Sequence, residues 1–410
     1  MEEKVFFPLE VSVLEESCCL TKERLGQHLA IRSSWKRDEH VFDNLDLSQI
    51  QSLTVFGEWR EFFVPYKMRS LRVLDLEDTS NVTHDHLEQI IEQLPRLRFL
   101  SLRGCSEISR LPDSLAGLRQ LQTIDIRDTS IVTLPKSVVK LEKLQYICAG
   151  TTVPLMDMEP APAPAPRRWL RTSSFLPRLA RPESFGTNGI QVPRGIGQLK
   201  ALHTLGVINV NGVDGEAILK ELKNLTKLRK LQVSGINRKN SKELCAAISG
   251  HSHLESLSVQ VKEFAGVIKF PGNLMKLSLD MPELQHQYMQ DLGKLEKLHT
   301  LNLRMTADAE GEVKFERSRE DAGSSLAHSF GQLKVLKIAS SFSLHVSFAE
   351  GLMGKLELLK VNCKYGSSLE LSGLAHLTCL KQVCVKGPCD DILKQQLDEH
   401  PNEPVLKLEE

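Results

Sequence analysis

The sequence predicts an α/β solenoid: a curved horseshoe with a parallel sheet on its concave face and short or irregular helices on its convex face. The first observation behind this prediction is a recurring apolar phrase, written LRFLSLRGCSEISRLP at residues 97–112 and LQTIDIRDTSIVTLP at residues 121–135. The second is its spacing, because most copies lie 20 to 26 residues apart along the 410-residue chain. The third is a core that must be aliphatic, since aromatic residues make up only 5% of the chain. Together they favour thin stacked layers over a single globular core.

The recurring phrase follows the template LxxLxL, with Leu, Ile or Val at the apolar positions. About 14 copies are present, including a degenerate one, GQHLAI, that starts at Gly26. The intervals fall within the roughly 20 to 29 residues that are typical of leucine-rich repeats. The clear copies start at Ile50, Leu71, Leu97, Leu121, Leu144, Leu202, Leu228, Leu254, Leu274, Leu298, Leu333, Leu356 and Leu380.

Each copy predicts one strand and one outer segment. The LxL part is a short strand of period two, so its apolar side chains point into the layer and the residue between them points to solvent. Several copies continue as in LPDSLAGLRQL and VPRGIGQLKAL, where apolar residues three apart suit a one-sided short or irregular helix that returns the chain over the outer face. Each copy buries the face of the next, so the repeats form one continuous core.

Two interruptions divide the repeats. The longer one alternates Ala and Pro, which favours extended polyproline II, and its arginines Arg167, Arg168 and Arg171 surround Trp169. We interpret it as either a contact with an acidic partner surface or another domain, or a solvated insertion. The shorter one, ADAEGEVKFERSREDAGSS before Leu333, is interpreted as a solvated polar insertion. The expected organisation is an N-terminal ragged segment (1–25), a first repeat block (26–150), the inserted loop (151–190), a second repeat block (191–389), and a C-terminal capping helix and strand (390–410).

Motifs for catalysis or cofactor binding are weak. There is no GxxxxGK[ST] phosphate loop, and nothing resembles a nucleophile with its base. The alternate histidines at 84 and 86 and at 251 and 253 lack ligand partners at metal-site spacing. Cys379, Cys384 and Cys389 form no CxxC pair, and the template places Cys384 on the solvent side of its strand. We therefore expect no enzyme, no cofactor and no metal. Cys105 and Thr129 follow their strands at a position that suits a bond to the backbone, a structural role.

The predicted binding surface is the concave face. In the first block its charges are mixed, whereas in the strands that start at Leu298, Leu333, Leu356 and Leu380 six cations stand against one acid, Glu357. Such a basic stripe commonly recruits an acidic protein surface; the alternative is a solvated face. The candidate protein-binding residues are Asp75, Glu77, Arg103, Asp125, Arg127, Arg304, Lys334, Lys337, Lys360, Lys381 and Lys386, with a further contact through Arg167, Arg168, Trp169 and Arg171.

Global charge and targeting signals narrow the function classes. The 52 basic and 52 acidic residues cancel, which argues against nucleic-acid binding through net charge. The N-terminus has no apolar region of a secretory signal, and no apolar run reaches the roughly 18 residues that span a bilayer. The nine cysteines are odd in number and scattered, which favours reduced thiols. We expect a cytoplasmic protein without membrane insertion.

Beyond the template itself, the amino-acid sequence of the repeats resembles the leucine-rich-repeat region of plant nucleotide-binding leucine-rich-repeat disease-resistance proteins, particularly the coiled-coil type of grasses. The resemblance covers roughly residues 20 to 410. It rests on LRVLDLEDT, LPRLRFLSLRGCSEISRLPDSLAGLRQLQTIDIRDTSIVTLPKSVVKLEKLQYICAG, VPRGIGQLKALHTLGVINV and the closing LKQQLDEHPNEPVLKLEE.

The resemblance implies a role in defence. In that family the repeat region follows a coiled-coil domain and a nucleotide-binding module, restrains that module, and senses pathogen effectors or modified host proteins. The partner implied for this chain is therefore a pathogen effector, a guarded host protein or a nucleotide-binding module. The chain resembles the C-terminal half of such a receptor without the two upstream modules. An alternative class is a repeat adaptor or substrate receptor of a ubiquitin ligase.

Overall fold

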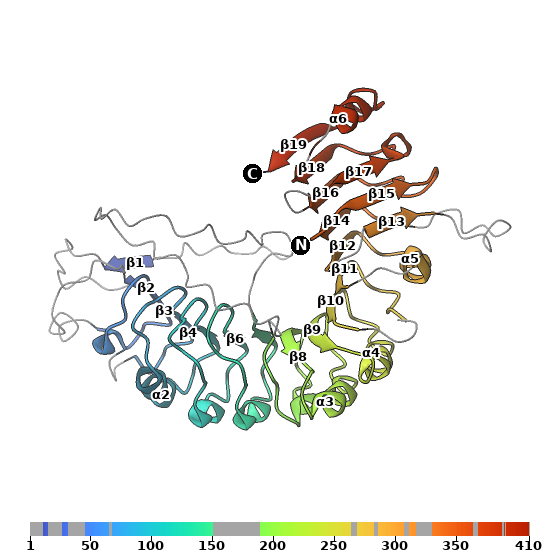
Figure 1. The fold of residues 1–410 in the computed structure, drawn as a ribbon. Helices are drawn as coiled ribbons and strands as arrows, with labels where there is room; N and C mark the ends of the chain where they lie inside the picture. The colour runs from blue at the N-terminus through green and yellow to red at the C-terminus, as the bar shows by residue number, and fades with distance from the viewer. Residues whose placement is uncertain are drawn as a thin grey trace, which may run out of the picture.

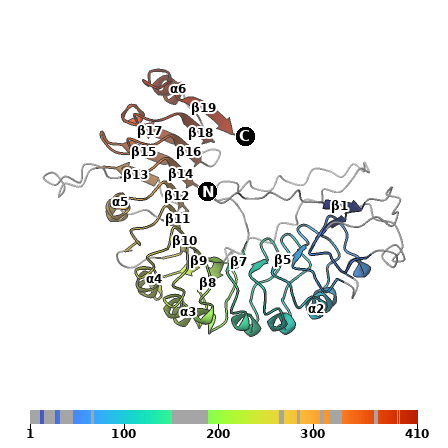
Figure 2. The same ribbon diagram turned by 180° about the vertical axis from the view of Figure 1, so that it is seen from behind.

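The computed structural model is a curved solenoid whose strands line the inner side of an arc and whose helices lie on the outer side (Figure 1). The same arc seen from behind keeps this order of layers (Figure 2). The structure describes residues 11–14, 27–31, 46–64, 68–150, 189–263, 269–282, 286–306, 311–316, 330–363, 368–387, 389 and 391–409.

A 16-stranded parallel sheet forms the concave layer, with its strands in chain order except that β13, β15 and β17 belong to another sheet. Fourteen of these strands were expected from the template or its degenerate copy, and β1 lies in the segment that precedes them. The strands are β1 (Val11–Leu14), β2 (His28–Ile31), β3 (Ser52–Val55), β4 (Val73–Asp75), β5 (Phe99–Ser101), β6 (Thr123–Asp125), β7 (Tyr146–Cys148), β8 (Thr204–Asn209), β9 (Lys230–Ile236), β10 (Ser256–Val261), β11 (Lys276–Met281), β12 (Thr300–Met305), β14 (Val335–Ser340), β16 (Leu358–Cys363), β18 (Gln382–Lys386) and β19 (Val405–Glu409).

The template leucines meet across the strands in register. Leu231 in β9, Leu257 in β10 and Leu277 in β11 are direct neighbours, and each is completely buried. The first leucine of the template, for example Leu254, is buried as well and sits just before its strand. The leucines of each repeat therefore pack against those of the next repeat and bury them, as the repeated pattern predicts.

The outer layer is made of short helices, and the sequence pattern explains where they begin. Pro112 and Pro135 stand directly before η2 and η3 in extended conformation, and a proline that lacks an N–H is well tolerated there. Thr83 caps α2 by accepting a hydrogen bond from the His86 N–H at 3.3 Å. The helices are η1 (Glu61–Phe63), α2 (His84–Gln93), η2 (Asp113–Gly117), η3 (Lys136–Lys140), η4 (Ile196–Gln198), α3 (Gly215–Leu222), α4 (Ser241–Ile248), α5 (His286–Gly293), η6 (Leu374–His376) and α6 (Asp391–Asp398).

We call the part of the arc from β1 to β7 the N-terminal arm and the part from β11 to β19 the C-terminal arm. On the C-terminal arm three strands join the outer layer, which the sequence analysis did not predict. They are β13 (Gly311–Phe315), β15 (Leu344–Phe348) and β17 (Leu369–Ser372), and they pair in parallel (Figure 1). Strand β13 lies inside the shorter interruption, so the interpretation of that whole stretch as a solvated insertion was wrong. The reason is its alternation, which buries Val313 and Phe315 and stacks the Phe315 ring on Phe348 at 5.3 Å.

The sheet continues across the longer interruption. Tyr146 of β7 pairs with Thr204 of β8, although almost sixty residues separate them in the chain. Residues 151–188, including Arg167, Arg168, Trp169 and Arg171, lie outside the described residues. The register between β8 and β9 shifts at Leu205 to Val207, so the junction of the two blocks contains an irregular strand.

Candidate functional site

The concave face carries the side chains that stand between the buried leucines. Because the strands are parallel and in register, these side chains form rows that run across the sheet. One of them, which we call the middle row, contains Asp75 and Asp125 on the N-terminal arm. On the C-terminal arm it contains Lys337 and Lys360 as direct neighbours. Four of the predicted site residues therefore share one row, but they lie at opposite ends of the arc.

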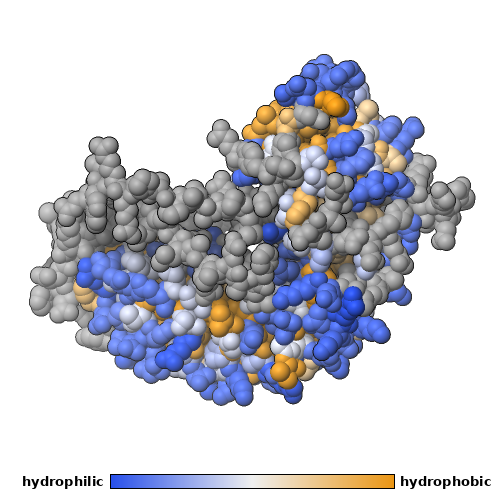
Figure 3. Space-filling view, viewed as in Figure 1, coloured by the Kyte–Doolittle hydropathy of each residue, from blue (hydrophilic) through white to orange (hydrophobic). Residues whose placement is uncertain are grey.

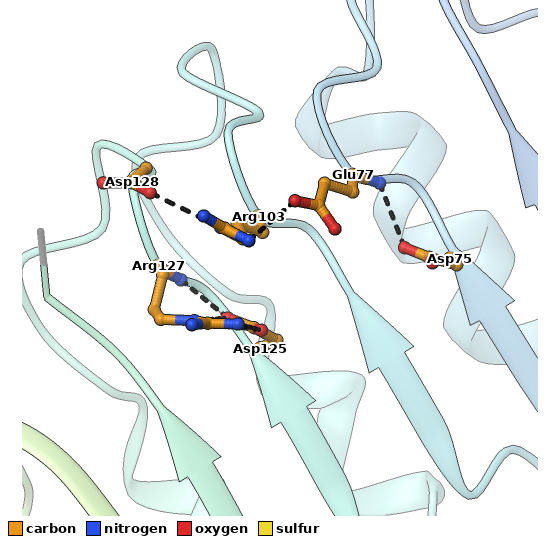
Figure 4. A network of polar contacts seen from close by, with 6 residues as sticks. All are labelled: Asp75, Glu77, Arg103, Asp125, Arg127 and Asp128. Atoms are coloured by element: carbon orange, nitrogen blue, oxygen red, sulfur yellow. Dashed lines mark hydrogen bonds and ion pairs between the residues drawn. The ribbon is translucent and has the colours of Figure 1, made fainter. Parts of the chain in front are cut away.

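The other predicted residues of the N-terminal arm gather in one cluster, the N-terminal charge network (Figure 4). Arg103 donates to Glu77 at 2.8 Å and lies 3.6 Å from Asp128. The Arg127 Nε donates to Asp125 at 2.9 Å, and the hydrogen bond and charge of this carboxylate raise the pKa of Arg127 above its ordinary value. The network consists of Asp75, Glu77, Arg103, Asp125, Arg127 and Asp128.

Two acids of this network also shape the turns that follow their strands. Asp75 accepts the Glu77 N–H at 3.2 Å, and Asp125 accepts the Arg127 N–H at 3.1 Å. Gly104 lies beside these turns with a φ of +75°, and a Cβ there would sit on the Asp78 carboxylate. The charges on this arm therefore largely satisfy one another and hold the loops in place.

The C-terminal arm is basic, but several of its predicted cations have acidic neighbours. Two acids come from strands outside the four that were counted: Asp280 on β11 lies 3.9 Å from Arg304, and Glu409 on β19 lies 2.5 Å from Lys360. Within the counted strands, Glu357 accepts from Lys381 at 2.8 Å. Three carboxylates thus stand among the six predicted cations.

Burial raises the pKa of the Asp280 carboxyl, while Arg304 and a hydrogen bond from Gln260 lower it. This acid is therefore held in place by two neighbours on the same face. Lys337 is different, because within the described ranges no carboxylate lies at ion-pair distance from it. It is half-buried next to Lys360, so it remains an uncompensated positive charge of the middle row.

Apolar residues on the concave face were missed by the sequence analysis. Tyr146 is 39% exposed, and its ring lies 5.8 Å from that of His203. Phe99 on the same arm, and Val335 with Leu358 on the other, occupy the position just before the second template leucine and are half-buried. The available signal was an apolar residue at a position that the alternating pattern assigns to solvent.

One prediction about the cysteines was wrong, and another was confirmed. The template assigned Cys384 to solvent, but it is only 4% exposed, so that prediction was wrong. It does lie on the concave side, where the Gln382 Nε2 donates to its Sγ at 2.8 Å and the ion pair between Lys360 and Glu409 spans its strand. The predicted backbone bonds are confirmed: Cys105 donates to the Leu76 carbonyl at 3.1 Å, and Thr129 donates to the Ile126 carbonyl at 2.8 Å.

The thiols of Cys105 and Cys363 should resist alkylation, because burial raises the pKa of each to about 12 and the thiolate is the reactive form. In iodoacetamide labelling of the folded protein at pH 8, followed by mass spectrometry, we expect both to react at least about a hundredfold more slowly than a simple thiol. The exposed Cys379 is the control and should react readily. Equal labelling of Cys105 and Cys379 would contradict this environment.

The first of the two histidine pairs, His84 and His86, has partners that are not metal ligands. His86 Nε2 lies 2.9 Å from Glu61, and His84 Nε2 lies 3.1 Å from the Ser109 hydroxyl. Over the described ranges, no three His, Cys, Asp or Glu side chains gather closely enough to hold a metal ion. Over the same ranges, no helix is long and apolar enough to cross a membrane.

A polar hollow lies away from the concave rows, at the loops that follow β8 and β9. Its volume is about 600 Å³, and Arg238, Lys239, Lys262 and Glu263 are among its lining residues. Arg238 lies 3.3 Å from Glu263, so two of these charges already satisfy each other. None of the predicted site residues lines it.

Comparisons with known proteins agree with this architecture. Over 212 residues the chain is 31% identical to Disease resistance protein Pik-2 of rice (Oryza sativa subsp. japonica). The matched region covers 52% of this chain and 20% of that protein. Over 107 residues it is 38% identical to rice Disease resistance protein RGA4, and this region covers 26% of this chain and 10% of that protein. The chain thus matches about a fifth or less of the length of these relatives.

A solved structure, the LRR protein of Leptospira interrogans, superposes with a TM-score of 0.53 over 92% of this chain and 89% of that one. The sequences are 15% identical, so the likeness concerns the fold alone. A family model described as "Leucine-rich repeat region" matches residues 49–159 and 267–406, together more than half of the chain. The repeat register, the parallel inner sheet and this match agree, and the chain belongs to the leucine-rich repeat family.

Proposed function

We propose that this chain is a non-enzymatic protein-recognition module that works in plant defence, in the manner of the sensor and autoinhibitory region of an intracellular immune receptor. Its relatives are rice disease-resistance proteins, which supports the defence role. Its site of action is the cytoplasm, where such receptors work. The partner is a pathogen effector, a guarded host protein, or the nucleotide-binding module of a receptor.

The segregation of charge on the concave face carries this proposal. On the N-terminal arm the charges of Arg103 and Arg127 are matched by nearby carboxylates. On the C-terminal arm lysines outnumber acids, and Lys337 has no carboxylate at ion-pair distance among the described residues. An acidic protein surface would complement this arm and associate faster at low salt.

The proposal is tested with rice Pik-2 from which the segment matched by this chain has been removed. The purified chain should bind this truncated protein, and changing Lys334, Lys337, Lys360 and Lys386 together to glutamate should weaken the affinity at least about tenfold. The physical reason is that the reversal replaces attraction by repulsion over the whole arm. Biolayer interferometry at two salt concentrations measures the effect.

The matched control reverses four exposed lysines on the outer side: Lys136, Lys140, Lys223 and Lys227. It changes the net charge by the same amount, so it should leave the affinity within about twofold. If the concave reversal left the affinity unchanged, the basic face would not be the binding surface. If the wild-type chain did not bind at all, restraint of such a receptor by this chain would be refuted.

A further inference from the structure

We infer that the C-terminal arm of the concave face binds an extended acidic segment that carries a large apolar side chain. The inference rests on the proposed function, since it specifies the partner of the same face. It goes beyond charge, because the arm combines an apolar strip, lysines on both sides of that strip, and two polar groups that lack partners.

The apolar strip consists of Val335 on β14 and Leu358 on β16. The two residues are direct register neighbours, so their side chains stand one strand spacing apart, roughly 4.8 Å. Both are half-buried on the concave side, whereas the corresponding position of β12 carries Thr300. Two adjacent apolar residues at a solvent-facing position give a large side chain a place to lose contact with water.

Lysines border this strip on both sides along β14 and on one side along β16. Lys334 directly precedes Val335, whereas Glu357, which accepts from Lys381, precedes Leu358. On the other side lie Lys337 and Lys360 of the middle row. Lys334 and Lys337 are three positions apart, or roughly 10 Å of strand, so a bound segment meets ammonium groups before and after its apolar side chain.

Two neighbouring polar groups lack partners. Asn302 donates through its Nδ2 to the Ser278 hydroxyl at 2.9 Å, but its Oδ1 is buried without a hydrogen bond. The residue beside Asn302 in register is Lys337, which has no carboxylate at ion-pair distance within the described ranges. The Asn302 Oδ1 costs free energy because it is buried without a donor. Lys337 is partly exposed, so its ammonium group can meet a carboxylate of a bound segment.

The mixture of charges favours a peptide over a nucleic acid. Asp280, Glu357 and Glu409 stand among the lysines of this arm. They would repel a uniformly charged phosphate backbone, which also has no use for the apolar strip. An acidic peptide can place an apolar residue on the strip and carboxylates beside the lysines on either side of it.

The test uses fluorescein-labelled peptides and fluorescence anisotropy in 50 mM NaCl. The peptide EEELEEE should bind the full chain at least about tenfold more tightly than EEEAEEE, because only leucine fills the strip. The variant K337M should weaken EEELEEE about tenfold. The variant L358A should abolish the preference for leucine over alanine, which a general loss of charge attraction would not do.

The variant K136M removes an exposed outer lysine and should leave binding unchanged, and circular dichroism verifies that each variant is folded. Equal binding of EEELEEE and EEEAEEE would overturn the apolar strip. Tighter binding of a DNA duplex than of EEELEEE would assign the arm to nucleic acid instead. If the chain bound truncated Pik-2 but not EEELEEE, this inference would fail while the proposed function stood.

Discussion

Substituting alanine for Leu257 is expected to lower the free energy of unfolding by about 3 kcal/mol, within the range of roughly 2 to 5 kcal/mol for buried leucines. Leu257 lies in β10 and is completely buried between its register neighbours Leu231 and Leu277. Its removal leaves a cavity that two template leucines line. Because neighbouring repeats hold those leucines in place, the walls cannot collapse to fill it.

Urea unfolding followed by circular dichroism measures this loss. The control is V213A, because Val213 is fully exposed and its truncation should change the free energy of unfolding by less than about 0.5 kcal/mol. Since each repeat contacts mainly its neighbours, amide exchange should also become faster in β9 to β11 than in β4 to β6. A loss below 1 kcal/mol for L257A would mean that the stacked leucines do not support one another as described.

Sequence reasoning reached the inner layer because its physics is local and repeated. The template LxxLxL predicts a strand whose second and third leucines face the core, and equivalent template positions of successive copies are expected to lie side by side. Leu231, Leu257 and Leu277 were therefore placed correctly. The outer layer obeys a weaker rule, so its three strands were not predicted, and β13 was interpreted as part of a solvated insertion.

For the candidate site, the sequence predicted where the charged residues lie but not which residues they pair with. The alternation placed Lys337 and Lys360 on the concave face, where the structure has them as neighbours. What it could not supply is which carboxylate reaches which cation, since Glu409 approaches Lys360 from two strands away. The alternation also could not supply the contact of Gln382 with the buried Cys384 thiol. Such contacts depend on side-chain length and on strands that are distant in sequence.

The irregular strand at the junction of the two repeat blocks gives the second large expected effect. Gly206 lies in β8 at the point where the register with β9 shifts, so it is the extra residue of a bulge. A Cβ at this position would lie 2.4 Å from the backbone nitrogen of Ala149 and 3.0 Å from the carbonyl oxygens of Ala149 and Ile147. These neighbours are backbone atoms, so no side-chain rotation can relieve the clash.

The variant G206A should therefore lower the free energy of unfolding by about 3 kcal/mol, at the upper end for overpacked sites, by forcing β7 and β8 apart. The same urea experiment measures it, and G250A is the control because a Cβ at Gly250 meets no atom within 4 Å. That control should be neutral or slightly stabilising, since alanine restricts the unfolded chain. An unchanged free energy of unfolding for G206A would mean that β8 is not packed tightly against Ala149, and that the two repeat blocks can move apart to admit a methyl group. A large loss would instead show that the backbone of the first block packs too closely against Gly206 to admit a methyl group, which no leucine pattern could reveal.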